Sequence, residues 1–475
     1  MKKNKLAYLF SILIFFVISC SEDKMDEIDY NNNILVEAPL QSILPQVTAK
    51  YVSQIVLSED ARQAAYISEV TARVLGRNEY DDLSTSRPSW TNAYALLRDL
   101  EILKEKAIEN KGWLYAGIAD FFKAATLSYL VDMFGDIPYS EAVKLDIESP
   151  NFDNATDIYD EIFIILDEAV SNIEKEGAII SPKKDDMFFG GDKILWKKTV
   201  YALKARLLNR LSNLDPKGSA QNVLAAIQNS YQNTNESMIF KRFIDATGNR
   251  NPLTAQHETA IGLGIWNAML HFSTNKNIED DPRYVWFTVL PDGERRPAPN
   301  GQAQADFGTG YQGRLYSKPE HQKNLAAPAP IITYNELLFL KAESYHRLGN
   351  LPEAYKAYQE AVTLSLKESM KYDPNRSISS EEINTYLSLP LVSPGVDNLS
   401  MQDIILQKII LFFNFQWVEA LNEVRRTNVI PANNPLGRIH RLPYPDVELM
   451  RNVNSPKDVN INTLFLDKYK LFWAY

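Results

Sequence analysis

Apolar residues recur every three to four positions along most of this 475-residue chain, which is the spacing of amphipathic helices. The pattern predicts helices over 40–58, 62–74, 90–111, 113–133, 155–174, 195–211, 219–228, 333–348, 351–371, 379–387 and 401–426. Strand patterns are few and short, as over 285–290. The sequence therefore predicts a mainly α fold.

The clearest pair of helices starts at Tyr334 and follows the tetratricopeptide pattern. Small residues, among them Ala342 and Ala354, stand where two helices would touch, and Gly349 would end the first helix. Looser pairs are formed by 113–133 with 155–174 and by 195–211 with 219–228. Because one such pair cannot bury its apolar face alone, we expect a tetratricopeptide-like helical-pair scaffold forming a single domain over 40–475.

Long irregular loop insertions should separate these pairs. The largest covers about 229–330 and is rich in Gly, Asn, Gln, Pro and aromatic residues. Loops of that length in a compact protein usually carry function, so we expect the functional surface there.

The N-terminus predicts export and lipidation. Lys2, Lys3 and Lys5 precede an apolar run over 6–18 that is too short to span a bilayer, as in a signal peptide. Cys20 is the only cysteine, so it forms no disulfide within the chain. We predict a signal peptide over 1–19, lipid on Cys20 and a flexible acidic tether over 20–39. The alternative, a buried cysteine in an ordinary helix, fits the basic flank less well.

Charge limits the partners of the protein. The formal net charge of −10 becomes −13 once the three lysines of 1–19 are removed, because that segment contains no acid. An acidic body repels nucleic acid and anionic lipid, so attachment to a membrane would depend on the acyl chains.

The sequence contains no recognisable catalytic or metal-binding motif. The five histidines are scattered, and no nucleophile elbow, zinc-protease motif or phosphate-binding loop is present. We therefore predict a protein that is not an enzyme and has no cofactor or metal site. A pair of carboxylates suited to glycoside hydrolysis stays open, since only the fold decides which acids are close.

Several motifs in order resemble one known family. Phe134 to Ala142 read FGDIPYSEA, and further matching motifs are Trp90 with Tyr94, Trp196 before 203–206, 281–283, 332–336, 341–343 and 441–445 with Glu448 and Asn452. Together they are similar to the SusD/RagB-like nutrient-binding outer-membrane lipoproteins of Bacteroidetes. Gly135 and Asp136 would serve a sharp turn and its capping, so these motifs indicate the scaffold and not the ligand site.

The resemblance implies a partner, a cargo and a place in the cell. The partner would be a SusC-like TonB-dependent transporter, and the cargo an oligosaccharide or, in some branches, a peptide. The acidic stretch after Cys20 resembles a surface-export signal, which implies an outer-membrane protein facing the cell exterior.

Sugar capture needs aromatic faces for the C–H faces of pyranose rings, with amides and guanidinium groups for the hydroxyls. The candidate ligand-binding residues are Trp90, Asn92, Trp266, Asn267, Tyr284, Trp286, Tyr311, Arg314 and Tyr316. For Trp90 a place in the core is the favoured alternative, since it opens an amphipathic helix.

Four functions fit these observations to different degrees. Glycan capture with a transporter accounts for all of them, and peptide cargo on the same fold is not separable from it by sequence. A surface glycoside hydrolase and a pure protein-interaction scaffold are the other two alternatives.

Overall fold

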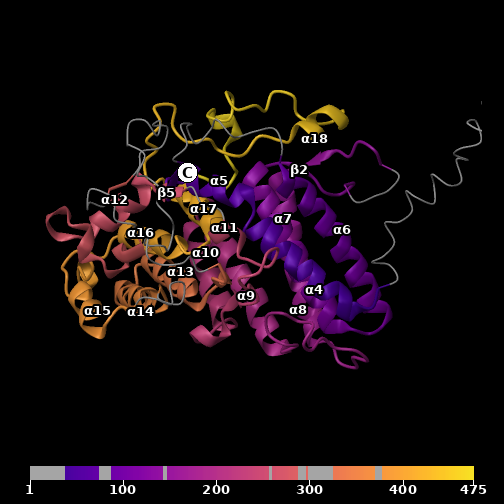
Figure 1. The fold of residues 1–475 in the computed structure, drawn as a ribbon, viewed down its shortest axis with the longest axis horizontal. Coiled ribbons are helices and arrows are strands. Elements are labelled where there is room, and N and C mark those ends of the chain that lie inside the picture. The colour runs from indigo at the N-terminus through magenta and orange to yellow at the C-terminus, as the bar shows by residue number, and fades with distance from the viewer. Residues whose placement is uncertain are drawn as a thin grey trace, which may run out of the picture.

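The computed structural model describes residues 38–73, 87–142, 147–255, 259–286, 296–297, 325–369 and 377–475. Helices dominate this part of the chain, which confirms the predicted mainly α class (Figure 1). The α-helices are α4 (Leu40–Lys50), α5 (Glu59–Ile67), α6 (Pro88–Glu109), α7 (Trp113–Phe134), α8 (Ala155–Glu174), α9 (Lys193–Arg210), α10 (Pro216–Gln228), α11 (Pro252–Ala255), α12 (Leu263–His271), α13 (Tyr334–Arg347), α14 (Leu351–Ser369), α15 (Ser380–Leu387), α16 (Met401–Phe412), α17 (Trp417–Thr427) and α18 (Asp446–Arg451).

Strands in the described residues form three short antiparallel pairs. They join β1 (Thr71–Arg73) to β5 (Thr259–Ile261), β2 (Ile137–Pro138) to β3 (Phe152–Asp153), and β4 (Met238–Phe240) to β6 (Ala329–Ile332). In each pair the two strands are at least a dozen residues apart in the chain, so the pairs fasten loops to the helical body.

Helix α7 is the centre of one half of the molecule. It is apolar on all sides and contacts α6, α8 and α9, so almost every residue from Leu114 to Phe134 is buried (Figure 1). Gly135 then turns the chain sharply with φ +80°, and the Asp136 carboxylate accepts a hydrogen bond from the backbone N–H of Ala155 at the start of α8. The predicted role of Gly135 in the turn is confirmed, whereas the Asp136 carboxylate binds the first backbone amide of α8 where capping of the turn was predicted.

The predicted tetratricopeptide-like pair is also confirmed. Helices α13 and α14 contact each other along their lengths, and Gly349 separates them with φ +76°. Ala342, Ala354 and Ala361 are fully buried, so small side chains allow the helices to approach closely.

The single helix predicted over 401–426 is wrong, because the chain breaks between α16 and α17. Phe415 has φ +67°, and the Phe413 carbonyl accepts a hydrogen bond from Trp417 Nε1 at 3.0 Å. All three aromatic side chains are buried, so their packing outweighs the helical spacing of the sequence.

Two other predicted helices differ from the structure. The helix predicted over 40–58 is α-helical only as far as Lys50, where α4 ends, and continues as a π-helical turn, η2 (Tyr51–Val56). The helix predicted over 62–74 ends at Ile67, because Glu69 is left-handed with φ 62° and strand β1 follows. That strand needs the backbone of 71–73 for its pairing with β5.

The insertion predicted to be irregular has regular structure in its described part. It contains η4 (Thr234–Glu236), β4, α11, β5, α12, η5 (Thr274–Lys276), η6 (Ile278–Asp280), η7 (Pro282–Trp286) and β6. The strand predicted from residue 285 is wrong for its first two residues, which belong to the 3-10 helix η7.

In the described residues, every helix is too short or too polar to cross a membrane.

Candidate functional site

The candidate binding surface lies on α12, which carries Trp266 and Asn267. Two glycines place the start of this helix against the turn before β1: a Cβ atom at Gly262 would lie 2.1 Å from the Glu69 carbonyl oxygen, and one at Gly264 would lie 2.8 Å from it. Only glycine allows so close an approach. The glycines therefore fix where the side chains of α12 lie.

Trp266 is half-buried and packs against the hydrophobic core, while Asn267 beside it is exposed. A partly exposed indole next to a solvated amide is the combination that recognises a sugar ring, because the indole can face C–H groups and the amide can bond hydroxyls. Peptides use the same groups. The surface is therefore suited to binding either kind of ligand.

The end of α12 is fixed to the start of α16. His271 Nε2 lies 2.8 Å from a carboxylate oxygen of Asp403, which also caps its own helix with Ser400. Although burial acts to raise it, the hydrogen bonds from His271 and Ser400 hold the pKa of Asp403 below its ordinary value. His271 is thus a structural link in this site.

Tyr284 follows one of the most buried arginines of the chain. The Arg283 guanidinium donates from Nη2 to Asp281 at 2.6 Å and to Gln407 at 2.9 Å, and from Nη1 to Ser365 at 2.9 Å. These bonds fasten η7 to α14 and α16. Tyr284 is half-buried, and its segment reaches α12 through η6, which contacts both.

Trp90 and Asn92 lie in α6, at the opposite end of the molecule from α12 (Figure 1). Trp90 is only 3% exposed, and the rings of Phe134, Tyr94 and Tyr444 surround it at centroid distances of 4.9, 5.1 and 5.8 Å. A ring enclosed in this way offers no face to a sugar. The favoured alternative for Trp90, a place in the core, matches the structure, and we leave it out of the binding surface.

The structure does not place the other predicted residues in the site. For Trp286 it describes only the backbone, which forms the last residue of η7. Tyr311, Arg314 and Tyr316, like Cys20, lie outside the described residues.

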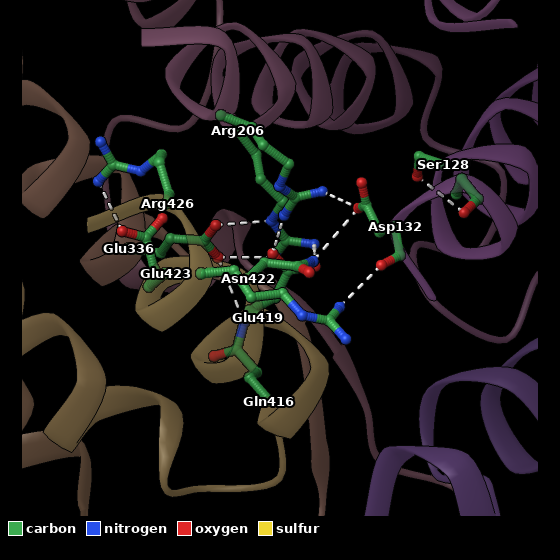
Figure 2. A network of polar contacts seen from close by, with 12 residues as sticks. Ser128, Asp132, Arg206, Glu336, Gln416, Glu419, Asn422, Glu423 and Arg426 are labelled. Atoms are coloured by element: carbon green, nitrogen blue, oxygen red, sulfur yellow. Dashed lines mark hydrogen bonds and ion pairs between the residues drawn. The ribbon is translucent and has the colours of Figure 1, made fainter. Parts of the chain in front are cut away.

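Sequence reasoning missed a buried polar network in the centre of the molecule. Figure 2 shows Arg206, Asp132 and Glu419 meeting from α9, α7 and α17. Arg206 makes two bonds of 2.6 Å to Glu336, and Arg210 pairs with both Asp132 and Glu419. Asp132, near the end of the mostly apolar helix α7, is the signal that could have indicated it.

A cavity of about 50 Å³ adjoins this network and is lined in part by Asp132, Arg206 and Glu419. That volume holds a few water molecules but no sugar ring. Burial raises the pKa of Asp132 to about 6, against the effect of Arg210. The network therefore joins helices and is not a ligand site.

Metal chemistry has no visible centre in the described ranges, which contain no group of three or more His, Cys, Asp or Glu residues suited to hold an ion.

The fold is that of a mainly helical protein with a tetratricopeptide-like helix pair. The family model described as "Starch-binding associating with outer membrane" matches residues 31–443. The chain therefore belongs to the SusD-like family.

Solved structures agree on the fold. A SusD/RagB family protein from Bacteroides thetaiotaomicron is 22% identical, with a TM-score of 0.76 over 92% of this chain and 99% of that one. A SusD homologue from Parabacteroides distasonis is 18% identical, with a TM-score of 0.73 over 92% and 98% of the two chains. A chitin-binding protein is 20% identical, with a TM-score of 0.71 over 91% and 99%. No curated protein matches the chain.

Proposed function

We propose that this protein is a cell-surface substrate-binding lipoprotein that captures an oligosaccharide and delivers it to a SusC-like TonB-dependent outer-membrane transporter. The observation that carries the proposal is the match of the starch-binding family over residues 31–443. A chitin-binding protein of the same fold supports a glycan as the cargo. The partly exposed Trp266 beside Asn267 supplies the chemistry that a sugar needs.

The proposal includes the membrane anchor. Cleavage before Cys20 and lipid on its thiol would hold the protein on the outer membrane, with 20–39 as the tether and the body facing the cell exterior. Mass spectrometry of the protein purified from cells tests this part: the expected N-terminal peptide begins at an acylated Cys20, and an unmodified residue 1 would contradict it.

Isothermal titration of residues 21–475 against a panel of neutral oligosaccharides tests the cargo. We expect saturable binding of at least one glycan, and a loss of tenfold or more in affinity for Trp266→Ala, which is about 1.4 kcal/mol. Asn267→Ala should also weaken binding, because it removes a hydrogen-bonding amide.

Trp113→Ala is the matched control, since Trp113 is also half-buried but opens α7. Equal losses in Trp266→Ala and Trp113→Ala, or no loss in either, would remove α12 from the site. Binding of a peptide pool in place of glycans would favour peptide cargo, and release of shorter sugars on incubation would favour the glycoside hydrolase.

A further inference from the structure

A second cleft opens where α13 and α17 end and α16 begins. Its volume is about 550 Å³, within the range of small-ligand sites. Its lining includes Ser212, Asn213, Arg347, Gln402, Arg426 and Tyr475. Two arginines line it, and none of the described residues on its lining is an aspartate or a glutamate.

The charges behind this cleft do not balance. Glu343 is paired with Lys408, with Arg426 at 2.6 Å and with Arg347 at 3.5 Å, and Glu423 is paired with Lys408 at 2.9 Å and Arg426 at 2.6 Å. Three cations thus share two carboxylates. Burial acts to raise the pKa of Glu343, but Arg426 and Lys408 hold it below its ordinary value, so that carboxylate is ionised and one positive charge is left over.

The neighbouring network shows that such an excess is not general in this protein. There the carboxylates of Asp132, Glu336 and Glu419 form ion pairs with Arg206 and Arg210, while Arg425 donates to the backbone carbonyl of Asp132. An uncompensated charge in a buried cluster is unfavourable unless a counter-ion or solvent approaches it.

Arg347 is the cation with the weakest bonding in the cluster, although its side chain is only 9% exposed. Nη2 donates to Asn209 at 2.6 Å, but the contacts with Glu343 and Ser344 are 3.5 Å long. Within the described residues, the buried Nε atoms of Arg347 and Arg426 have no hydrogen-bond partner. Burial also lowers the pKa of Arg347, as expected for a guanidinium without enough compensating charge.

We propose that this cleft is a subsite for the carboxylate group of an acidic oligosaccharide, with Arg347 and Arg426 as its cationic partners. Guanidinium groups bind carboxylates with paired, charge-assisted hydrogen bonds. Tyr475, 71% exposed on the lining, supplies an aromatic face for the sugar ring that carries the acid. The proposal rests on the glycan function above and narrows its substrate to sugars that bear uronic acid.

The test compares an oligogalacturonide with its carboxyl-reduced, neutral counterpart by isothermal titration of residues 21–475 at fixed ionic strength. We expect the acidic form to bind at least tenfold more tightly. Arg347→Gln should remove this preference, whereas Arg250→Gln, which changes an exposed arginine paired with Asp245, should keep it.

Gln402→Glu gives a second variant that spares the buried cluster. Gln402 is exposed in the first turn of α16, where an acidic side chain favours the helix, so the variant should fold. Its new carboxylate should weaken binding of the acidic sugar and leave the neutral one unchanged. Equal affinities for the two sugars, or a preference that survives in both variants, would overturn the subsite.

Two further probes separate the possible failures. If neither oligosaccharide binds, titration with glucuronate alone still decides the subsite: saturable binding that Arg347→Gln loses supports it, and no binding overturns it. The panel of neutral oligosaccharides decides the proposed function separately. If inorganic sulfate binds but glucuronate does not, the cleft holds a free anion and the sugar assignment is wrong.

Discussion

Arg206 and Glu336 form a two-pronged ion pair between α9 and α13. Arg206 Nε and Nη2 each donate at 2.6 Å to a different oxygen of the Glu336 carboxylate, and Nη2 also donates to the Ile331 carbonyl at 2.6 Å. Both side chains are buried. The pair therefore holds the tetratricopeptide-like helices against the centre of the scaffold.

Removing one partner of this pair should destabilise the protein strongly. Arg206→Met leaves Glu336 buried beside Gln416 alone, and we expect a loss of about 3–5 kcal/mol in the free energy of unfolding. Urea denaturation followed by far-UV circular dichroism measures it. Lys204→Met, which breaks an ion pair with the exposed Asp167, is the control and should cost less than about 1 kcal/mol.

The raised pKa of Asp132 predicts a specific dependence of stability on pH. Burial raises this pKa from 3.8 to about 6, so the folded state holds the proton more tightly than the unfolded state. That contribution to stability is complete below pH 4 and is lost as the pH rises through about 6. Relative to Asp132→Asn, the wild type should lose up to about 3 kcal/mol between pH 4 and pH 7.

Urea denaturation of both proteins at several pH values measures this difference. Groups that titrate in both proteins cancel in the comparison, so only the change in the difference matters. If the difference in the free energy of unfolding between the two proteins stayed constant, or grew in favour of the wild type as the pH rises, the raised pKa of Asp132 would be contradicted.

Gly135 should not tolerate a side chain. Its φ of +80° favours glycine, and a Cβ atom there would lie 2.6 Å from Nη1 of Arg441. That nitrogen donates to the Phe134 carbonyl and to the Tyr444 hydroxyl, so it cannot move without losing bonds. We expect Gly135→Ala to lower the melting temperature clearly, with a cost of about 2–3 kcal/mol.

The control for this variant is Gly177→Ala. Gly177 has φ +77° but no atom within 4 Å of an added Cβ, so it carries the backbone strain without the clash. It should cost about 1 kcal/mol. Equal effects of the two variants in differential scanning calorimetry would mean that contact with Arg441 is unimportant.

Asp186 closes a loop before α9 and is a further test of the packing. Its carboxylate accepts hydrogen bonds from Trp196 Nε1 at 2.7 Å and from the backbone N–H of Gly191 at 2.8 Å, and it is 2% exposed. Asp186→Ala leaves both donors without that acceptor, and we expect a loss of about 2–4 kcal/mol. Limited proteolysis should cut this loop sooner than in the wild type, and unchanged cleavage would contradict the role of Asp186.

The spacing of apolar residues predicted most of the scaffold, because each helix forms where its own segment offers an apolar face for packing. The pair formed by α13 and α14 was readable from the alternation of small and large residues. The break at Phe415 was not, since no glycine or proline is present between Phe413 and Trp417, and the left-handed residue results from burial of three aromatic rings. Long-range packing of this kind has no signal in a single segment.

The candidate site was predicted only in part for the same reason. Trp266 and Tyr284 were selected from composition, and their elements are connected in the structure through η6. Trp90 has the same side chain as Trp266 but lies enclosed by Phe134 and Tyr444, which is 354 positions away in the chain. Whether a tryptophan is buried in the core or exposed on the surface depends on such distant neighbours. The unequal numbers of cations and carboxylates around Glu343 also depend on residues that are far apart in the chain.

The contacts of Asp132 also set the order in which the chain can fold. Its side chain accepts a hydrogen bond from Asn422, 290 residues later, and its carbonyl accepts one from Arg425, 293 residues later. During synthesis, Tyr159 and Arg210, which also bond Asp132, follow α7 much sooner than Asn422 and Arg425 do. Closing so large a loop is slow compared with forming local helices. The packing of α7 against α17 should therefore be completed only when nearly all of the chain has been made.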